Sequence, residues 1–163
     1  MIERLLRDLR QPEYVHTLLN PLPIYGLGLG LVGLLIALCL RSRAAQVTAL
    51  FLILISAASA WPAVYFGEQA KSQILMLADE DGRAWLADHE KRAERLQYFF
   101  LALALVTVAA LLVPKKWPRA AIPLVVATVV LALCSLGAGM SIAYAGGKIR
   151  HREFRTVPPP GNN

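Results

Sequence analysis

The apolar residues of this chain fall into four long runs, each about as long as the roughly 20 residues that cross the hydrocarbon core of a bilayer. The runs cover residues 24–40, 46–66, 96–113 and 120–145, and no Asp, Glu, Lys or Arg lies inside any of them. Because Pro62 lacks the amide hydrogen that a helix needs, it should kink the second run. The pattern predicts an all-α integral membrane four-helix bundle, with residues 1–163 forming a single domain.

The helical spacing of apolar residues continues past the end of the second run and begins before the third. Between residues 67 and 95 an apolar position recurs every three or four residues among charged ones, which is typical of helices packed along one side. We therefore expect helices two and three to extend into a hairpin, 67–95, that stands about 15–20 Å above the membrane. Its two apolar seams should face each other, and Asp81 should cap the second helix.

The two ends of the chain predict peripheral segments. Ile2, Leu5, Leu6 and Leu9 fall on one helical face with charged residues around the other, which predicts a short helix lying at the membrane interface and ended by Pro12. This segment lacks the apolar core and cleavage site of a signal peptide, so we expect the first span to be retained. The tail, residues 156–163, should be extended and mobile.

The net charge of +6 is distributed unevenly about the spans. In a membrane protein such an excess anchors and orients the chain, so we expect the lipid bilayer to be a partner and nucleic acid not to be one. Arg41 and Arg43 follow the first run at once, and positive charges at that point favour the cytoplasmic side. The two short turns should then be cytoplasmic, with both termini and the hairpin on the opposite side.

All three histidines belong to the side of the membrane that carries the hairpin. His16 lies eight residues before the first run, His89 seven before the third, and His151 six after the fourth. If the chain is helical there, His89 and His151 stand at one height, about 9–10 Å above their helix ends. His89 also lies on the apolar seam, so it should point inward.

These histidines support two ligand hypotheses. In the first, His89 and His151 are the axial ligands of haem b, and glycines of the first and fourth runs make room for the porphyrin. In the second, His16, His89 and His151 bind a single transition-metal ion, with Glu68 as a further ligand. The glycines of the first run are equally explained by close helix packing, and the histidines by a structural role.

Four blocks of the chain resemble a known family. They are HTLLNPLPIYGLGLG, FGEQA, HEKRA and GGKIRHREFR, spread over residues 14–155. They resemble the uncharacterised bacterial four-helix membrane proteins catalogued as domain of unknown function 2231. The resemblance implies a bacterial inner membrane location, with termini on the periplasmic side in the orientation above, and an association with electron transfer. By the same resemblance Glu68, His89, Gly147 and His151 carry over as site residues, with Gly147 beside a cofactor.

The sequence thus predicts a histidine-lined site at one membrane face that binds haem b or a metal and serves electron transfer, with a redox protein or larger membrane complex as partner. The chain contains no phosphate loop, Gly-x-Ser-x-Gly, Cys-x-x-Cys or His-Glu-x-x-His motif, so we assign no catalytic residue and expect an electron carrier or subunit rather than a stand-alone enzyme. One alternative is a scaffold that docks a partner complex through the 67–95 hairpin and the tail. Another is a metal-sensing or metal-handling membrane protein, and an oligomer is compatible with each.

Overall fold

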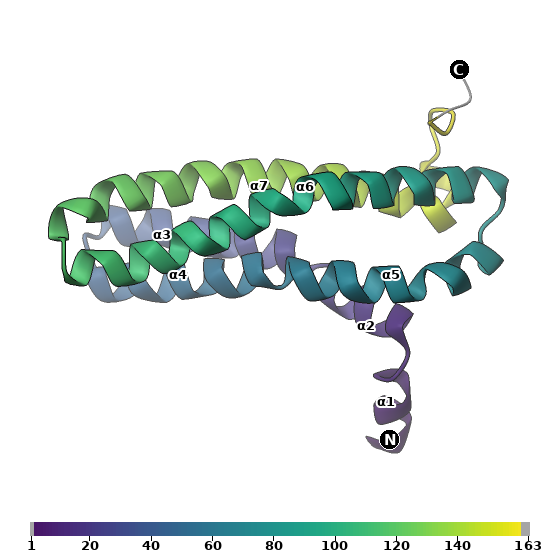
Figure 1. Ribbon diagram of the computed structural model, residues 1–163, viewed down its shortest axis with the longest axis horizontal. Coiled ribbons are helices and arrows are strands. Elements are labelled where there is room, and N and C mark those ends of the chain that lie inside the picture. The colour runs from purple at the N-terminus through teal and green to yellow at the C-terminus, as the bar shows by residue number, and fades with distance from the viewer. Residues whose placement is uncertain (1, 161–163) are drawn as a thin grey trace.

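The computed structural model describes residues 2–160, which are almost entirely helical and contain no strand (Figure 1). The described residues form these α-helices: α1 (Ile2–Asp8), α2 (Pro12–Leu19), α3 (Leu27–Cys39), α4 (Arg43–Ala58), α5 (Ala60–Leu77), α6 (Glu80–Leu112) and α7 (Ala121–Arg150). A π-helical turn, Leu22–Gly26, joins α2 to α3, and short 3₁₀ turns lie at Val113–Lys115, Pro118–Ala120 and Arg152–Phe154. The all-helical prediction is confirmed.

Four helical stretches are long and apolar enough to cross a membrane. They are Pro12–Cys39, Arg43–Leu77, Glu80–Lys115 and Pro118–Arg150. The stretches cover the four apolar runs, except for Leu40 at the end of the first run, and each extends beyond its run at the same end of the molecule. The prediction of four candidate spans is therefore confirmed.

The four long helices pack together at the end of the molecule where the apolar runs lie. There α3 packs on α4, α4 on α6, and α6 on α7 along much of its length. Leu27, Leu34, Leu50, Ile53 and Leu103 form the centre of this core and are fully buried. Burial of such side chains holds the helices in register.

The segment before the first apolar run differs from the prediction. Pro12 does not end the helical structure but begins α2, because a proline at the first helical position needs no amide hydrogen. The chain then continues through the π-helical turn into α3. Because α2 packs on α5, His16 is brought against that helix.

The hairpin is present, but its two helices do not close on each other. Pro62 was expected to kink the second run; the structure instead has a short interruption at Ser59, three residues earlier, where α4 ends at Ala58 and α5 begins at Ala60. Asp79, not Asp81, caps α6, since its carboxylate accepts a hydrogen bond from the Gly82 amide at 2.9 Å. α5 packs mainly on α2, whereas α6 packs mainly on α7. A cavity lies between the two predicted seams, and only near the tip do Ile74 and Leu75 of α5 pack against the cluster that contains Leu86 of α6.

The C-terminal residues fold back over the tip of the hairpin. Arg155 donates hydrogen bonds to the carbonyl oxygens of Lys148 and Ile149, each at 2.8 Å, and to the Asp79 carboxylate at 2.9 Å. This side chain therefore caps the end of α7 and ties it to the start of α6. Of the tail predicted to be mobile, residues 161–163 lie outside the described part of the chain, as does Met1 of the predicted domain.

The predicted amphipathic helix at the N-terminus is α1. It projects from the bundle and runs across the long axis of the molecule (Figure 1). Ile2, Leu5 and Leu6 on its apolar face are exposed.

Candidate functional site

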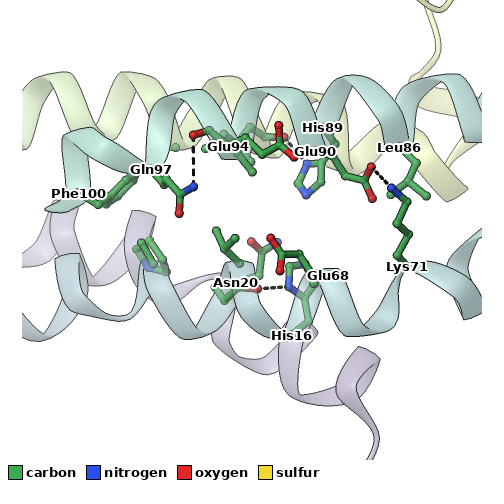
Figure 2. Close-up of a pocket in the computed structure, with 18 of the residues that line it drawn as sticks. His16, Asn20, Glu68, Lys71, Leu86, His89, Glu90, Glu94, Gln97 and Phe100 are labelled. Atoms are coloured by element: carbon green, nitrogen blue, oxygen red, sulfur yellow. Dashed lines mark hydrogen bonds and ion pairs between the residues drawn. The ribbon is translucent and has the colours of Figure 1, made fainter.

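A cavity of about 350 Å³ separates the α2–α5 pair from the α6–α7 pair. Its walls are mostly apolar, and the two histidines His16 and His89 lie on opposite sides of it (Figure 2). Phe100 and Gly139 lie at the end nearer the helix core, and Leu86 and Ile149 line the end nearer the hairpin tip. A mostly apolar cavity of this size with a few convergent polar groups is typical of a small-molecule or cofactor site.

His16 enters the cavity from α2 and is held against α5. Its Nδ1 lies 2.7 Å from the carbonyl oxygen of Ala63. The ring lies directly on Gly67, where an added Cβ would come within 3.0 Å of both Cε1 and Nδ1. Since a carbonyl oxygen only accepts, Nδ1 must carry the hydrogen, which leaves Nε2 with its lone pair.

His89 enters from α6 and is held against α7 in the same way. Its Nδ1 lies 2.9 Å from the carbonyl oxygen of Ile142. A Cβ at Gly146 would again come within 3.0 Å of Cε1 and Nδ1. Burial lowers the pKa of His89, and the nearby His16 lowers it further, although the Ile142 carbonyl acts in the opposite sense. The neutral imidazole that can donate a lone pair is thus the favoured form.

The two imidazoles form a matched pair. Their ring centres lie 6.5 Å apart, and their planes are inclined by 87°. Figure 2 shows the two rings pointing toward one another across the cavity. Within residues 2–160 neither Nε2 has a hydrogen-bond partner, so both remain available to a ligand placed between them.

The rim of the cavity is polar. Lys71 on α5 donates a hydrogen bond to Glu90 on α6 at 2.7 Å, and this bridge raises the pKa of the lysine. Glu68 and Glu94 also line the cavity, together with the neutral donors Asn20 and Gln97. The rim therefore offers a few hydrogen-bond donors within a predominantly acidic setting.

Glu68 lies on the same cavity as the two histidines, as the metal-ion hypothesis expected. However, within residues 2–160 no group of three His, Cys, Asp or Glu side chains lies close enough to hold a metal ion. The described geometry therefore presents two imidazoles and not a complete ligand set for a bare ion.

The structure does not bring His151 to this cavity. α7 ends at Arg150, and His151 follows in an extended conformation with its side chain 58% exposed. Its Nδ1 pairs with Glu153 at 3.0 Å, and its ring stacks on Phe154. The face of α7 that meets the cavity includes Ile149, and two further residues turn a helix by about 200°, so His151 would point away even if the helix continued.

Gly147 also lies outside the cavity. The nearest neighbour of a Cβ added there would be Phe154, at 3.9 Å. Its neighbour Gly146 is the residue that contacts His89. The glycine pair was visible in the sequence, but only the rotation of α7 shows which member faces the site.

Sequence reasoning also missed the groups that hold the imidazoles. These are the carbonyl oxygens of Ala63 and Ile142, and Gly67. A backbone carbonyl leaves no signal in a sequence. The signal that could have been used is the glycine four residues after each carbonyl, since residues four apart lie on one helical face.

A scan against models of known protein families found no matching family, and searches of curated proteins and of solved structures found no similar protein.

Proposed function

We propose that this protein is a membrane-bound electron carrier that binds one haem b between His16 and His89. The observation that carries this proposal is the opposed imidazole pair, with ring centres 6.5 Å apart and both Nδ1 atoms held by backbone carbonyls. His16 takes the place that the sequence had suggested for His151.

The separation of the rings matches two axial ligands on one iron. A metal–imidazole bond of about 2 Å, plus about 1.2 Å from the nitrogen to the ring centre, places trans ligands roughly 6.4 Å apart, centre to centre. The same bonds at a tetrahedral angle would give roughly 5.2 Å. The observed 6.5 Å would therefore allow His16 and His89 to hold one iron between them, and a haem held there would supply one-electron chemistry.

The remaining walls suit a porphyrin. Apolar side chains and Gly139 line the cavity, and Gly67 and Gly146 let the Nδ1–Cε1 edges of the two imidazoles lie close against the helices. Lys71, Asn20 and Gln97 line the cavity. Lys71 already donates to Glu90 and Gln97 to the carbonyl oxygen of Glu94, but each has further N–H groups that would serve the haem carboxylates. Bound there, haem would supply a one-electron couple, and two imidazole ligands favour the six-coordinate state that suits electron transfer better than oxygen chemistry.

We further propose that the four long helices cross a bacterial inner membrane, with spans 24–40, 46–66, 96–113 and 120–145 and the hairpin and both termini on the periplasmic side. Support comes from large apolar side chains that face outward along the spans, such as Leu29 and Leu105, which are 74% and 64% exposed. Trp117 at one end of the bundle, and Trp61 stacked on Tyr65 at the other, have the positions expected of interfacial aromatic belts. α1, with its exposed apolar face, would lie at that interface.

Absorption spectra of purified single variants test the proposal. Detergent-purified protein from haem-replete cells should show a Soret band, with sharp α and β bands after reduction by dithionite. His16→Ala and His89→Ala should each lose the low-spin spectrum, because each removes one axial ligand.

His151→Ala is the matched control, since this histidine is exposed and outside the cavity. It should leave the spectrum unchanged. Loss of the low-spin spectrum in His151→Ala but not in His16→Ala would show that the assignment of the pair is wrong. Colourless protein that takes up no added haemin and co-purifies with another membrane complex would favour a scaffold instead.

A further inference from the structure

The two histidines are held by the same arrangement on two different helices. In each, Nδ1 donates to the carbonyl oxygen of one residue while the ring lies on the glycine four positions later. The pairs are Ala63 with Gly67 on α5 and Ile142 with Gly146 on α7. A hydrogen bond to the far nitrogen of a ligating histidine fixes both its tautomer and the rotation of its ring.

Each arrangement restricts the ring in two ways. The carbonyl sets the direction of the Nδ1–H bond, and the glycine backbone supports the ring edge at Nδ1 and Cε1. Because the two arrangements are on separate helices, neither imidazole can rotate to match the other without losing its own hydrogen bond. The observed 87° between the planes is therefore set by the positions of α5 and α7.

The angle between two axial imidazole planes has an electronic consequence in ferric low-spin haem. Each imidazole interacts by its π system with one of the two iron d orbitals that point out of the porphyrin plane. Two imidazoles with parallel planes act on the same d orbital and so separate the energies of the two orbitals. Two imidazoles with crossed planes act on one orbital each and leave the two orbital energies nearly equal. Near-equal orbitals give a large orbital moment and a very anisotropic g tensor.

We propose that the backbone carbonyls of Ala63 and Ile142, with Gly67 and Gly146, are positioning groups that hold the axial imidazoles crossed and so give the ferric haem a highly anisotropic low-spin state. This inference rests on the proposed function, because it concerns the same pair of ligands. It goes beyond haem binding, since the same histidines with parallel planes would bind haem equally.

Low-temperature electron paramagnetic resonance of the ferric protein, recorded beside its absorption spectrum, tests the inference. The expected result is a single broad feature at large g, without the resolved three-line rhombic spectrum of parallel imidazoles. A low-spin Soret spectrum accompanied by the rhombic three-line signal would overturn the inference and leave the proposed function intact. Absence of haem binding would overturn both.

Alanine variants at the two glycines provide a second readout. In Gly67→Ala or Gly146→Ala the new Cβ lies 3.0 Å from Nδ1 and Cε1, so the ring must move and its plane must turn. The large-g feature should shift while the absorption spectrum stays low-spin. Gly137→Ala, on α7 with no atom within 4 Å of the new Cβ, is the matched control and should leave the signal unchanged. Equal signals in all three variants would show that these glycines do not position the rings.

Discussion

Gly30→Ala decides whether the glycines of α3 serve helix packing or make room for a flat ligand. Gly30 lies where α3 crosses α4, and a Cβ added there would lie 2.9 Å from Cγ1 of Ile53 and 3.2 Å from its backbone nitrogen. Ordinary contact begins near 3.4 Å, and Ile53 is fully buried with a β-branched side chain that cannot turn aside. The two helices must therefore separate by several tenths of an ångström.

The magnitude follows from comparison with Gly28→Ala on the same helix, where a Cβ meets nothing within 4 Å. Both substitutions gain about 0.5–1 kcal/mol of helix propensity, but only Gly30→Ala suffers the overpacking penalty of about 1–3 kcal/mol. The difference in the free energy of unfolding between the two variants should therefore be about 1–3 kcal/mol, with Gly30→Ala the less stable. Unfolding by sodium dodecyl sulfate in mixed micelles measures it.

Equal stabilities for the two variants would refute the packing argument. A normal stability with weakened haem binding in Gly30→Ala would instead assign the glycine to the cofactor. The structure predicts the opposite, because Gly30 contacts Ile53 and does not line the cavity.

Two further predictions concern charge. Burial holds the pKa of His89 in the folded protein below its ordinary value of 6.5, so in acid the unfolded chain binds more protons than the folded one. This group should therefore leave the stability unchanged above pH 6.5. As the pH drops below 6.5, the stability should fall and haem should be released. Thermal unfolding and Soret absorbance followed from pH 7.5 to 5 measure this, and stability that rises toward pH 5 would contradict it. The Arg155 guanidinium holds the pKa of Asp79 well below its usual range, so the pair persists in mild acid. Arg155→Ala should lower the unfolding temperature by several degrees, because two carbonyl oxygens at the end of α7 lose the side chain that caps them. Arg150 makes no such contact, so Arg150→Ala should leave the unfolding temperature unchanged. Equal effects of the two substitutions would show that only the net charge matters.

The helices were predictable because each apolar run is long, uncharged and bounded by polar turns. The extension of helices two and three was also visible in the spacing of their apolar residues, and α5 and α6 have that form. Their relation in space was not predictable, because periodicity shows that a face is buried but not which helix buries it. The seams were paired with each other, whereas α2 and α7 take that role.

The site was predicted in part. His89 was correctly expected to point inward, since it lies on the apolar seam of α6, and it lines the cavity. His16 lies eight residues before the first run, a spacing close to that of His89, but its height depends on α2, which begins at Pro12 and is not evident from the apolar runs. The prediction of His151 requires α7 to continue as a helix, whereas in the structure α7 ends at Arg150 and Arg155 caps it. Proline at a first helical position is a local rule that the sequence already carries, whereas a side chain that caps a helix from beyond its end is a tertiary effect.

Titration of the detergent-purified apoprotein with haemin tests whether His16 and His89 together hold one haem. We expect the ferric six-coordinate low-spin spectrum to saturate at one haemin per chain. A protein carrying both His16→Ala and His89→Ala should show no such saturation while it retains its helical circular dichroism. A folded double variant that still forms the low-spin complex, or wild-type protein that never forms it, would contradict the claim that these two imidazoles share an iron.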